Sequence, residues 1–280
     1  MPVLRRKGSV FPEDDRIYVE AFKRRSPWEL DVTESFAVIG IPGIPDIEPG
    51  AELVDLICEA AAPIGVEPGD IVVVAQKVVS KAEGAIAALR DVSPSEEAMR
   101  VADTTGHTPA LVEVILSQSN RIVRMGQGVL ITETIHGFVC ANAGIDASNV
   151  LGEDEVTLLP ADADASAAGI RRALEARFGD PIGVIVSDSF NRPWRMGSVN
   201  VAIGVSGFYP LGDYRGHTDD HGVPLKSTLV SIADEIASAA QLVMGEFGRV
   251  PVAIVRGLEM TVGDGNGQTL LRDAERDLFR

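Results

Sequence analysis

Oxygen-bearing side chains follow several apolar segments of this sequence. Asp146 comes after one such segment in a turn of small residues, and Asp188 and Ser189 follow the apolar run 182–186 directly. Glu246 stands between two glycines near the end of an expected helix. Strand ends are where α/β proteins usually hold ligands, and Mg²⁺ and Mn²⁺ accept carboxylate and hydroxyl oxygens. These four residues therefore form a candidate divalent-metal set.

Each of these acidic residues also has a purely structural explanation. Asp146 could form a turn, Asp188 could cap a helix, and Glu246 could be a solvated residue of a loop. Spacing along the chain does not show that the side chains converge. Both interpretations stay open at this point.

Basic side chains near these positions could bind phosphate. Lys81 comes shortly after a buried strand is expected and could offer a point charge to a phosphate. Arg192 and Arg195 could grip an anion through paired hydrogen bonds, or form structural salt bridges in an acidic protein. His217 and His221 are four residues apart and suggest zinc ligands, but the glycines around them favour a loop.

Charge and hydropathy exclude several classes of protein. The chain has 280 residues with 25 Lys and Arg against 41 Asp and Glu, which gives a formal net charge of −16. Such a surface repels nucleic-acid phosphates and anionic lipids, so we expect neither a nucleic-acid nor a membrane-surface binder. No apolar stretch reaches the roughly 20 residues of a membrane span, and the N-terminus lacks the apolar core of a secretory signal. A cytoplasmic protein is expected.

The two cysteines, Cys58 and Cys140, both lie in apolar runs. Two cysteines cannot build a disulfide framework or a four-thiolate zinc site. We expect both to be buried, reduced thiols.

The common nucleotide and zinc signatures are missing from the sequence. It contains no G-x-x-x-x-G-K-[ST] loop, no G-x-G-x-x-G between a strand and a helix, and no H-E-x-x-H. The glycine-rich run 263–267 has no lysine after it and is expected to be a surface loop. Neither a Rossmann fold nor a P-loop fold is therefore predicted.

Periodicity predicts many strands with interspersed helices. Strands are expected at 36–41, 71–74, 121–125, 129–134, 138–141, 182–186, 199–205 and 252–255. Helices are expected at 52–61, from Ser93 as the N-cap to 104, from Thr108 and Pro109 onward, at 165–178, at 228–244 as the longest one, and at 269–279. Strands and helices do not alternate strictly, so a mixed α/β (α+β) fold is predicted. Residues 1–34 are charged and irregular and form an expected N-terminal extension to one domain, 35–280.

Several motifs, in this order and spacing, resemble the F420-0:gamma-glutamyl ligase family from about residue 41 to 258. They are Asn-Ala-Gly-Ile-Asp-Ala-Ser-Asn at 142–149, Ser-Asp-Ser at 187–189, Arg192, Arg195, Gly197, Ala-Asp-Glu-Ile at 233–236 and Met-Gly-Glu at 244–246. The resemblance implies two intimately packed subdomains in an intertwined homodimer. It also implies two divalent ions, Mg²⁺ or Mn²⁺, and a potassium ion, K⁺.

The same resemblance implies an activity, the GTP-dependent joining of L-glutamate to coenzyme F420-0 with release of GDP and phosphate. Further gamma-linked glutamates are left open. A carboxylate does not react with an amine at neutral pH, so the γ-phosphoryl group of GTP should first convert it to an acyl phosphate. Two other functions stay open: a metal-dependent nucleotide phosphohydrolase and a non-catalytic nucleotide-sensing dimer.

Residue by residue, the resemblance implies two groups of site residues. The metal ligands would be Asp146, Asp188, Ser189 and Glu246. The nucleotide contacts would be Ile44, Pro45, Asp46, Ile47, Gln76, Lys77, Lys81, Asn149, Met244, Gly245, Phe247, Gly248, Arg249, Val250 and Pro251. Two departures stand out: serine replaces an expected threonine at 189, and Ala-Gln-Lys at 75–77 occurs where the family often has small hydroxyl residues. No side chain is assigned as the base that deprotonates the glutamate amine.

Overall fold

The structure is a computed structural model that describes residues 35–146 and 154–278. The expected N-terminal extension, 1–34, lies outside the described residues. Asn149, one of the expected nucleotide contacts, also lies outside them.

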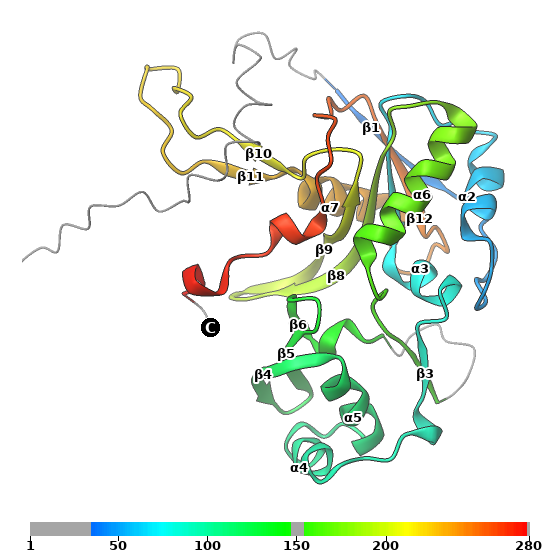
Figure 1. Cartoon of the computed structure of the whole chain (residues 1–280), viewed down its shortest axis with the longest axis vertical. Coiled ribbons are helices and arrows are strands. Elements are labelled where there is room, and N and C mark those ends of the chain that lie inside the picture. The colour runs from blue at the N-terminus through cyan, green and yellow to red at the C-terminus, as the bar shows by residue number, and fades with distance from the viewer. Residues whose placement is uncertain (1–34, 147–153, 279–280) are drawn as a thin grey trace, which may run out of the picture.

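A five-stranded sheet forms the centre of the molecule (Figure 1). Its strand order is β1 (Ala37–Ile41), β12 (Val252–Arg256), β2 (Ile71–Ala75), β8 (Gly183–Arg192) and β9 (Arg195–Ser206). β2 and β8 are parallel, and the other neighbouring pairs of this sheet are antiparallel. The sheet is therefore mixed in strand direction, and the mixed α/β fold predicted from the sequence is confirmed.

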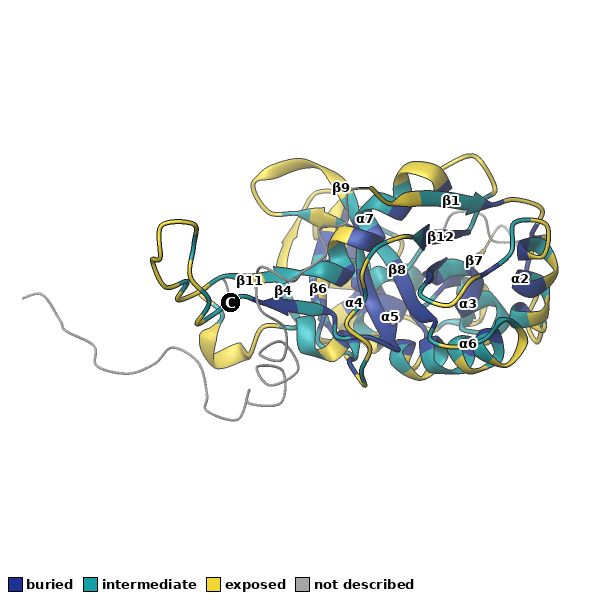
Figure 2. Ribbon diagram, turned by 90° about the horizontal axis from the view of Figure 1, so that it is seen from above, coloured by how far each residue is buried: buried dark blue, intermediate teal, exposed yellow. Residues whose placement is uncertain are grey.

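Helices cover both faces of this sheet, because its central strands are apolar on both sides. α2 (Leu53–Ala61) and α6 (Ala163–Phe178) pack on one face, and α7 (Ile232–Met244) packs on the other. Successive residues of β2 point to opposite faces of the sheet. Val72 packs in the apolar cluster beneath α2 and α6, and Val73 packs in the cluster beneath α7. Figure 2 shows the buried strands β8 and β12 between α7 and α6.

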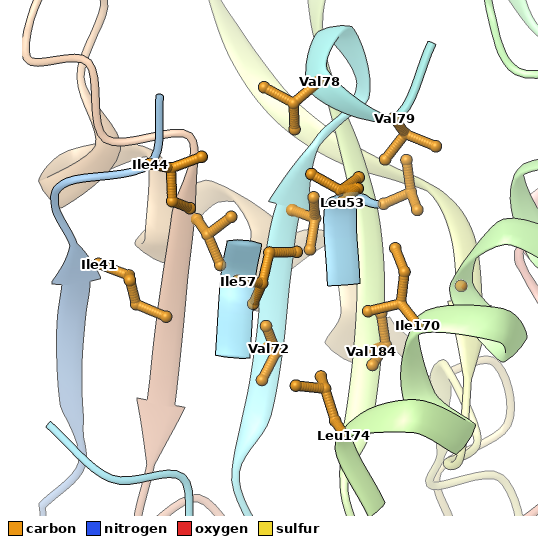
Figure 3. Packing of buried hydrophobic residues seen from close by; sticks show 14 of the residues in the cluster. Ile41, Ile44, Leu53, Ile57, Val72, Val78, Val79, Ile170, Leu174 and Val184 are labelled. Atoms are coloured by element: carbon orange, nitrogen blue, oxygen red, sulfur yellow. The ribbon is translucent and has the colours of Figure 1, made fainter. Parts of the chain in front are cut away.

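The cluster on the first face is built from side chains at helical spacing. Leu53 and Ile57 of α2 lie one turn apart, and so do Ile170 and Leu174 of α6. Figure 3 shows both helices directing these side chains toward strand β2 at Val72. Burial of this kind contributes about 25 cal/mol for each Å² of apolar surface removed from water.

A second group of elements lies below the main sheet in Figure 1. It consists of α4 (Glu96–Thr105), α5 (Pro109–Ser117) and a three-stranded antiparallel sheet, β4 (Ser119–Gly126), β5 (Val129–Thr134) and β6 (Val139–Ala141). This group has an apolar cluster of its own, formed by Ala98, Val101, Ala102, Val112, Ile115, Leu130 and Ala143. The two groups therefore have separate cores.

Shorter elements connect these groups. α3 (Gln76–Ala82) follows β2 without a gap, and β3 (Ile86–Ala88) pairs with β7 (Glu155–Thr157). β10 (Leu211–Asp213) pairs with β11 (Leu229–Ser231), and the chain between them projects from the molecule (Figure 1). No helix among the described residues is long and apolar enough to cross a bilayer.

Carboxylates tie the helices of the two faces to β9. Asp164 in the first turn of α6 accepts hydrogen bonds from the Val205 N–H at 2.8 Å and the Gly267 N–H at 2.6 Å. Asp234 in the first turn of α7 accepts one from the Ala202 N–H at 2.9 Å. Both helices are thereby fixed in position along this strand.

Most expected elements are confirmed within a few residues, and α4 shows how a boundary moves. The expected N-cap was Ser93, but the helix begins at Glu96 and Ser95 caps it, accepting a hydrogen bond from the Ala98 N–H at 3.1 Å. The Ser95 N–H donates to Glu113 of α5 at 2.8 Å. This contact between helices, which the local pattern does not contain, places the cap two residues later.

Two expectations about helices were wrong. The longest helix is α6, because the segment before Ile232 forms strand β11 instead of a helical turn. The expected terminal helix is replaced by two 3₁₀ turns, Gly267–Leu270 and Ala274–Arg276.

The glycine-rich run is not a surface loop at its later positions. Gly265 and Gly267 are buried. A Cβ at Gly265 would lie 2.3 Å from the Phe208 carbonyl oxygen, and one at Gly267 would lie 2.9 Å from that of Ile203. These glycines are required by close backbone packing rather than by flexibility.

Candidate functional site

The parallel pair β2 and β8 brings the start of α3 beside the polar end of β8. Ala75, the last residue of β2, is level with Ser187 of β8. Lys77 follows in the first turn of α3, and Asp188 follows Ser187. β8 does not end at residue 186, as expected, but continues to Arg192 because β9 pairs with it along this length. Asp188 therefore lies within a strand and is not a helix cap.

Asp146 reaches the same place from the second group of elements. Its carboxylate Oδ2 lies 3.2 Å from the Lys77 Nζ. Its backbone forms a bridge to Thr157 of β7, with Asp146 N–H donating at 3.1 Å and Thr157 N–H donating back at 2.9 Å. The structure thus brings together Asp146, Asp188 and Lys77, which the sequence places far apart.

The turn before Asp146 explains the small residues of this motif. Asn142, Ala143 and Gly144 all have positive φ, at 52°, 55° and 70°. A Cβ at Gly144 would lie 2.8 Å from Leu159 Cδ2. The backbone conformation and the close approach of Leu159 therefore both favour glycine at 144.

The surroundings of Asp188 oppose a negative charge in the absence of a cation. Burial raises the pKa of its carboxyl to about 7, and the nearby Asp146 also raises it. The Ser189 N–H, which donates to Asp188 Oδ1 at 2.8 Å, and the Lys77 ammonium act in the opposite direction. Burial, followed by the charge of Asp188, raises the pKa of the Cys140 thiol to about 12. Cys140 is buried, and so is Cys58, as expected.

An aromatic contact holds the second group of elements against β8. The Phe138 and Phe190 rings meet edge to face, with centroids 6.0 Å apart and planes at 78°. Such pairs add about 0.5–1.5 kcal/mol beyond simple burial. Phe190 follows Asp188 by two residues on β8, so this contact lies next to the two carboxylates.

Ser189, the expected hydroxyl ligand, has a different neighbour in this structure. Its Oγ donates to Asn200 Oδ1 on β9 at 2.7 Å, and the Asn200 side chain also donates to Ser187 Oγ at 3.3 Å. Asn200 is buried, and its carbonyl accepts a hydrogen bond from Ser238 of α7 at 2.8 Å. Asn200 is not among the residues predicted for the site, although a single asparagine in the otherwise apolar expected strand 199–205 is a usable signal.

Glu246, the fourth expected ligand, follows the end of α7. Its carboxylate accepts a hydrogen bond from Gln241 Nε2 at 2.6 Å. Among residues 35–146 and 154–278, no three His, Cys, Asp or Glu side chains gather closely enough to enclose a metal ion. Within one chain, the described residues therefore offer the pair Asp146 and Asp188, and a metal role for Glu246 stays a prediction.

The two long segments expected to bind nucleotide lie side by side. Arg249 contacts Asp46 with N···O at 2.5 Å, which joins the loop after β1 to the turn before β12. The Pro251 carbonyl accepts a hydrogen bond from the Ala75 N–H at 2.8 Å, so this turn also contacts the end of β2. The Arg249 guanidinium holds the pKa of Asp46 below its usual value, and Lys81 acts in the same direction.

The members of these segments differ in exposure. Ile44, Ile47 and Met244 are buried in the apolar clusters, whereas Pro45 and Asp46 are exposed. The later turn is open: Gly245, Phe247, Gly248 and Arg249 are exposed, Phe247 to 97%, and Val250 is half-buried. The exposed members are available to a ligand, while the buried ones shape the backbone.

Gln76 has a structural task. Its side chain is buried, and its Nε2 donates to Ser80 Oγ at 2.5 Å and to the Leu158 carbonyl at 2.8 Å. These bonds anchor α3 to the segment that follows β7. Contact between Gln76 and a nucleotide stays a prediction.

The remaining basic candidates lie in hairpins. Arg192 donates to the carbonyls of Met196 and Gly197 at 2.9 and 3.3 Å, so it closes the turn between β8 and β9. Arg195 is exposed beside it. His217 and His221 lie in the projecting segment between β10 and β11 and belong to no group of potential metal ligands within the described chain.

The chemistry of the donor set fits a hard divalent cation. Mg²⁺ is usually bound by one or two carboxylates and completes its coordination with water and substrate phosphates. Asp146 and Asp188 supply two such carboxylates. Burial disfavours the charged form of Asp188, and a bound cation would stabilise it.

Comparisons with known proteins show the family of this chain. The family model for F420-0:Gamma-glutamyl ligase matches residues 43–257. Coenzyme F420:L-glutamate ligase of Methanothermobacter thermautotrophicus is 45% identical over 249 residues, which cover 87% of this chain and 98% of the relative. The proteins of the same name from Methanocaldococcus jannaschii and Archaeoglobus fulgidus are 45% and 38% identical, covering 82% and 87% of this chain and 92% and 96% of their own. The chain belongs to the F420-0:gamma-glutamyl ligase family, a family of amide-forming ligases.

Proposed function

We propose that this protein joins L-glutamate to coenzyme F420-0 at the expense of GTP. Its family and the names of its relatives support the ligase chemistry. The observation that carries the assignment of the site is the position of α3. Lys77 of this helix contacts Asp146 of the carboxylate pair, and Lys81, one turn later, lies within electrostatic range of Asp46. One helix therefore spans the expected metal site and the expected nucleotide segments, about 6 Å apart along its axis.

The reaction proceeds in two transfers. The terminal carboxylate of F420-0 attacks the γ-phosphorus of GTP, which forms an acyl phosphate and releases GDP. The amine of L-glutamate then attacks the acyl carbon, a proton leaves the nitrogen, and phosphate departs as the amide forms. An acyl phosphate is needed because an unactivated carboxylate has no adequate leaving group.

The chain's own residues supply position and charge for these transfers. Lys81 and the exposed residues of the turn 245–251 would hold the nucleotide. Asp146 and Asp188 would hold divalent ions, which supply positive charge that offsets the phosphates of two anionic substrates. In a protein with a net charge of −16, such compensation is needed before two anions can meet.

Three further properties belong to this proposal. We expect a homodimer, activation by K⁺ in addition to Mg²⁺ or Mn²⁺, and a cytoplasmic location. The dimer is testable by sedimentation, because a 29.7 kDa species at micromolar concentration would contradict it.

The deciding experiment is a coupled assay with GTP, F420-0 and L-glutamate, analysed by mass spectrometry. The ligase predicts that GDP release requires F420-0 and that F420-0 gains the mass of a glutamyl residue. Phosphate release from GTP alone would indicate a phosphohydrolase, and binding without turnover would indicate a nucleotide sensor. Either result would overturn the proposal.

A further inference from the structure

The Lys77 ammonium occupies one side of the Asp146 carboxylate. The Nζ to Oδ2 distance is 3.2 Å, and the two side chains are only 36% and 30% exposed. Lys77 lies in the first turn of α3, directly after buried strand β2, so its backbone position is set by the main sheet. The contact is therefore part of the site and differs from a pair of long side chains meeting in solvent.

Three charged groups meet at this point, two carboxylates and one ammonium. Their formal sum is −1 when both carboxylates are ionised. A divalent ion that uses Asp146 and Asp188 must approach an ammonium that already contacts one of them. Cations at such distances repel strongly when they are partly shielded from water. Lys77 and a divalent ion would therefore compete for Asp146.

A bound nucleotide would change this competition. Its phosphates offer the ammonium another anionic partner, and a lysine side chain can rotate between partners because its charge lies on a flexible four-carbon stem. The helix that carries Lys77 also carries Lys81 one turn later, toward Asp46 and the expected nucleotide segments. Such a change would involve the Lys77 side chain and leave the α3 backbone in place, because the buried Gln76 anchors this helix.

We propose that Lys77 is a resident cation of the Asp146 and Asp188 pair, which competes with a divalent ion until nucleotide phosphate takes over the ammonium. This inference rests on the metal site of the proposed function. It makes the empty protein a weak binder of divalent ions and couples tight metal binding to the arrival of nucleotide.

The test is a titration of the whole protein with Mn²⁺ in the absence of nucleotide, with free Mn²⁺ measured by electron paramagnetic resonance. Lys77→Gln removes the charge and should bind Mn²⁺ at least about fivefold more tightly than the unmodified protein. Lys77→Arg keeps the charge and should retain the weak affinity. Lys226→Gln, a change of the same type at an exposed lysine, should have no effect. Equal affinity in Lys77→Gln and the unmodified protein overturns the inference.

A second titration in the presence of GDP tests the transfer of the ammonium. GDP should tighten Mn²⁺ binding by a larger factor in the unmodified protein than in Lys77→Gln, because the variant has no ammonium to displace. An equal gain in both proteins overturns this part of the inference. Melting temperatures of all variants confirm that each is folded.

Asp188→Asn separates the failure of this inference from the failure of the metal site. If Mn²⁺ binds the unmodified protein, is lost in Asp188→Asn and is unchanged in Lys77→Gln, the metal site stands and the role of Lys77 falls. If neither the unmodified protein nor Lys77→Gln binds Mn²⁺, the metal site of the proposed function falls as well.

Discussion

Arg249 and Asp46 form an ion pair at 2.5 Å although 203 residues separate them in the chain. This pair connects the loop after β1 to the turn between α7 and β12. Both side chains are largely exposed, at 72% and 67%. Its contribution is therefore to the arrangement of two loops and not to the stability of the fold.

Arg249→Ala should weaken nucleotide binding while leaving the melting temperature almost unchanged. The two loops lose their connection, so we expect the KM for GTP to rise severalfold with a nearly constant kcat. Steady-state kinetics and a thermal melt measure the two effects. Arg90→Ala, at another exposed arginine beside an aspartate, is the matched control. An unchanged KM in Arg249→Ala would remove the pair from the nucleotide site.

Asp146→Asn and Asp188→Asn should each abolish turnover without unfolding the protein. Each substitution removes one negative charge from the expected metal site, and we expect kcat to fall by at least about a thousandfold. Asp188→Asn should be at least as stable as the unmodified protein, because burial already disfavours the charged carboxyl. Asp103→Asn, at an exposed helical position, is the control. Full activity of either variant at saturating Mn²⁺ would exclude that residue as a ligand.

Lys81→Ala should weaken the binding of GTP and of ATP to the same extent, because a lysine would contact the phosphates, which both nucleotides share. The unmodified protein should prefer GTP by at least about tenfold in kcat/KM, since each unmet hydrogen bond to adenine costs about 1–3 kcal/mol. Kinetics with both nucleotides measure the ratio. Equal use of ATP and GTP would contradict the guanine preference and would leave the ligase chemistry standing.

Substitutions of Arg192 and Arg195 should have different effects, although the sequence alone suggests the same anion-binding role for both residues. Arg192→Ala removes two hydrogen bonds that close the β8 to β9 turn, so it should cost about 1 kcal/mol of folding free energy. Arg195→Ala should leave stability unchanged and raise the KM for F420-0. Urea denaturation and kinetics distinguish the two effects. A KM effect confined to Arg192→Ala would reverse the assignment.

Two serines near the start of α4 test the corrected helix boundary. Ser95→Ala removes the observed cap and should lower the free energy of unfolding by about 1 kcal/mol. Ser93→Ala should have little effect, because residue 93 lies before the cap. Chemical denaturation of both variants measures the difference. A larger loss in Ser93→Ala would support the boundary expected from the sequence.

The main sheet and its helices could be predicted from the sequence because their signals are local. β2 is a continuous β-branched run, and α2 repeats apolar residues at helical spacing. The strand predicted at 182–186 is shorter than the observed β8, because the outer half of β8 is polar and is stabilised by a partner strand later in the chain. Hydrophobic patterning detects burial, and this half of the hairpin is held mainly by backbone pairing.

The candidate site was less predictable than the fold. The sequence motifs identified Asp146 and Asp188, and the structure places both beside Lys77. The contact with Lys77 depends on the parallel register of β2 and β8, which no local pattern specifies. Ser189 and Glu246 have other partners in one chain, because a residue's neighbour depends on the strand or helix packed against it.

The carboxylates of Asp164 and Asp234 also limit how copies of the protein can meet. β9 is the last strand of the main sheet, and such an edge can be extended by a strand of another molecule through its free N–H groups. The N–H groups of Val205 and Ala202 are already bonded to these two side chains. A further strand would have to break both bonds before it could pair along 202–205. Strand addition by another copy of the protein is therefore disfavoured along 202–205, where residues of the covering helices already occupy these two N–H groups.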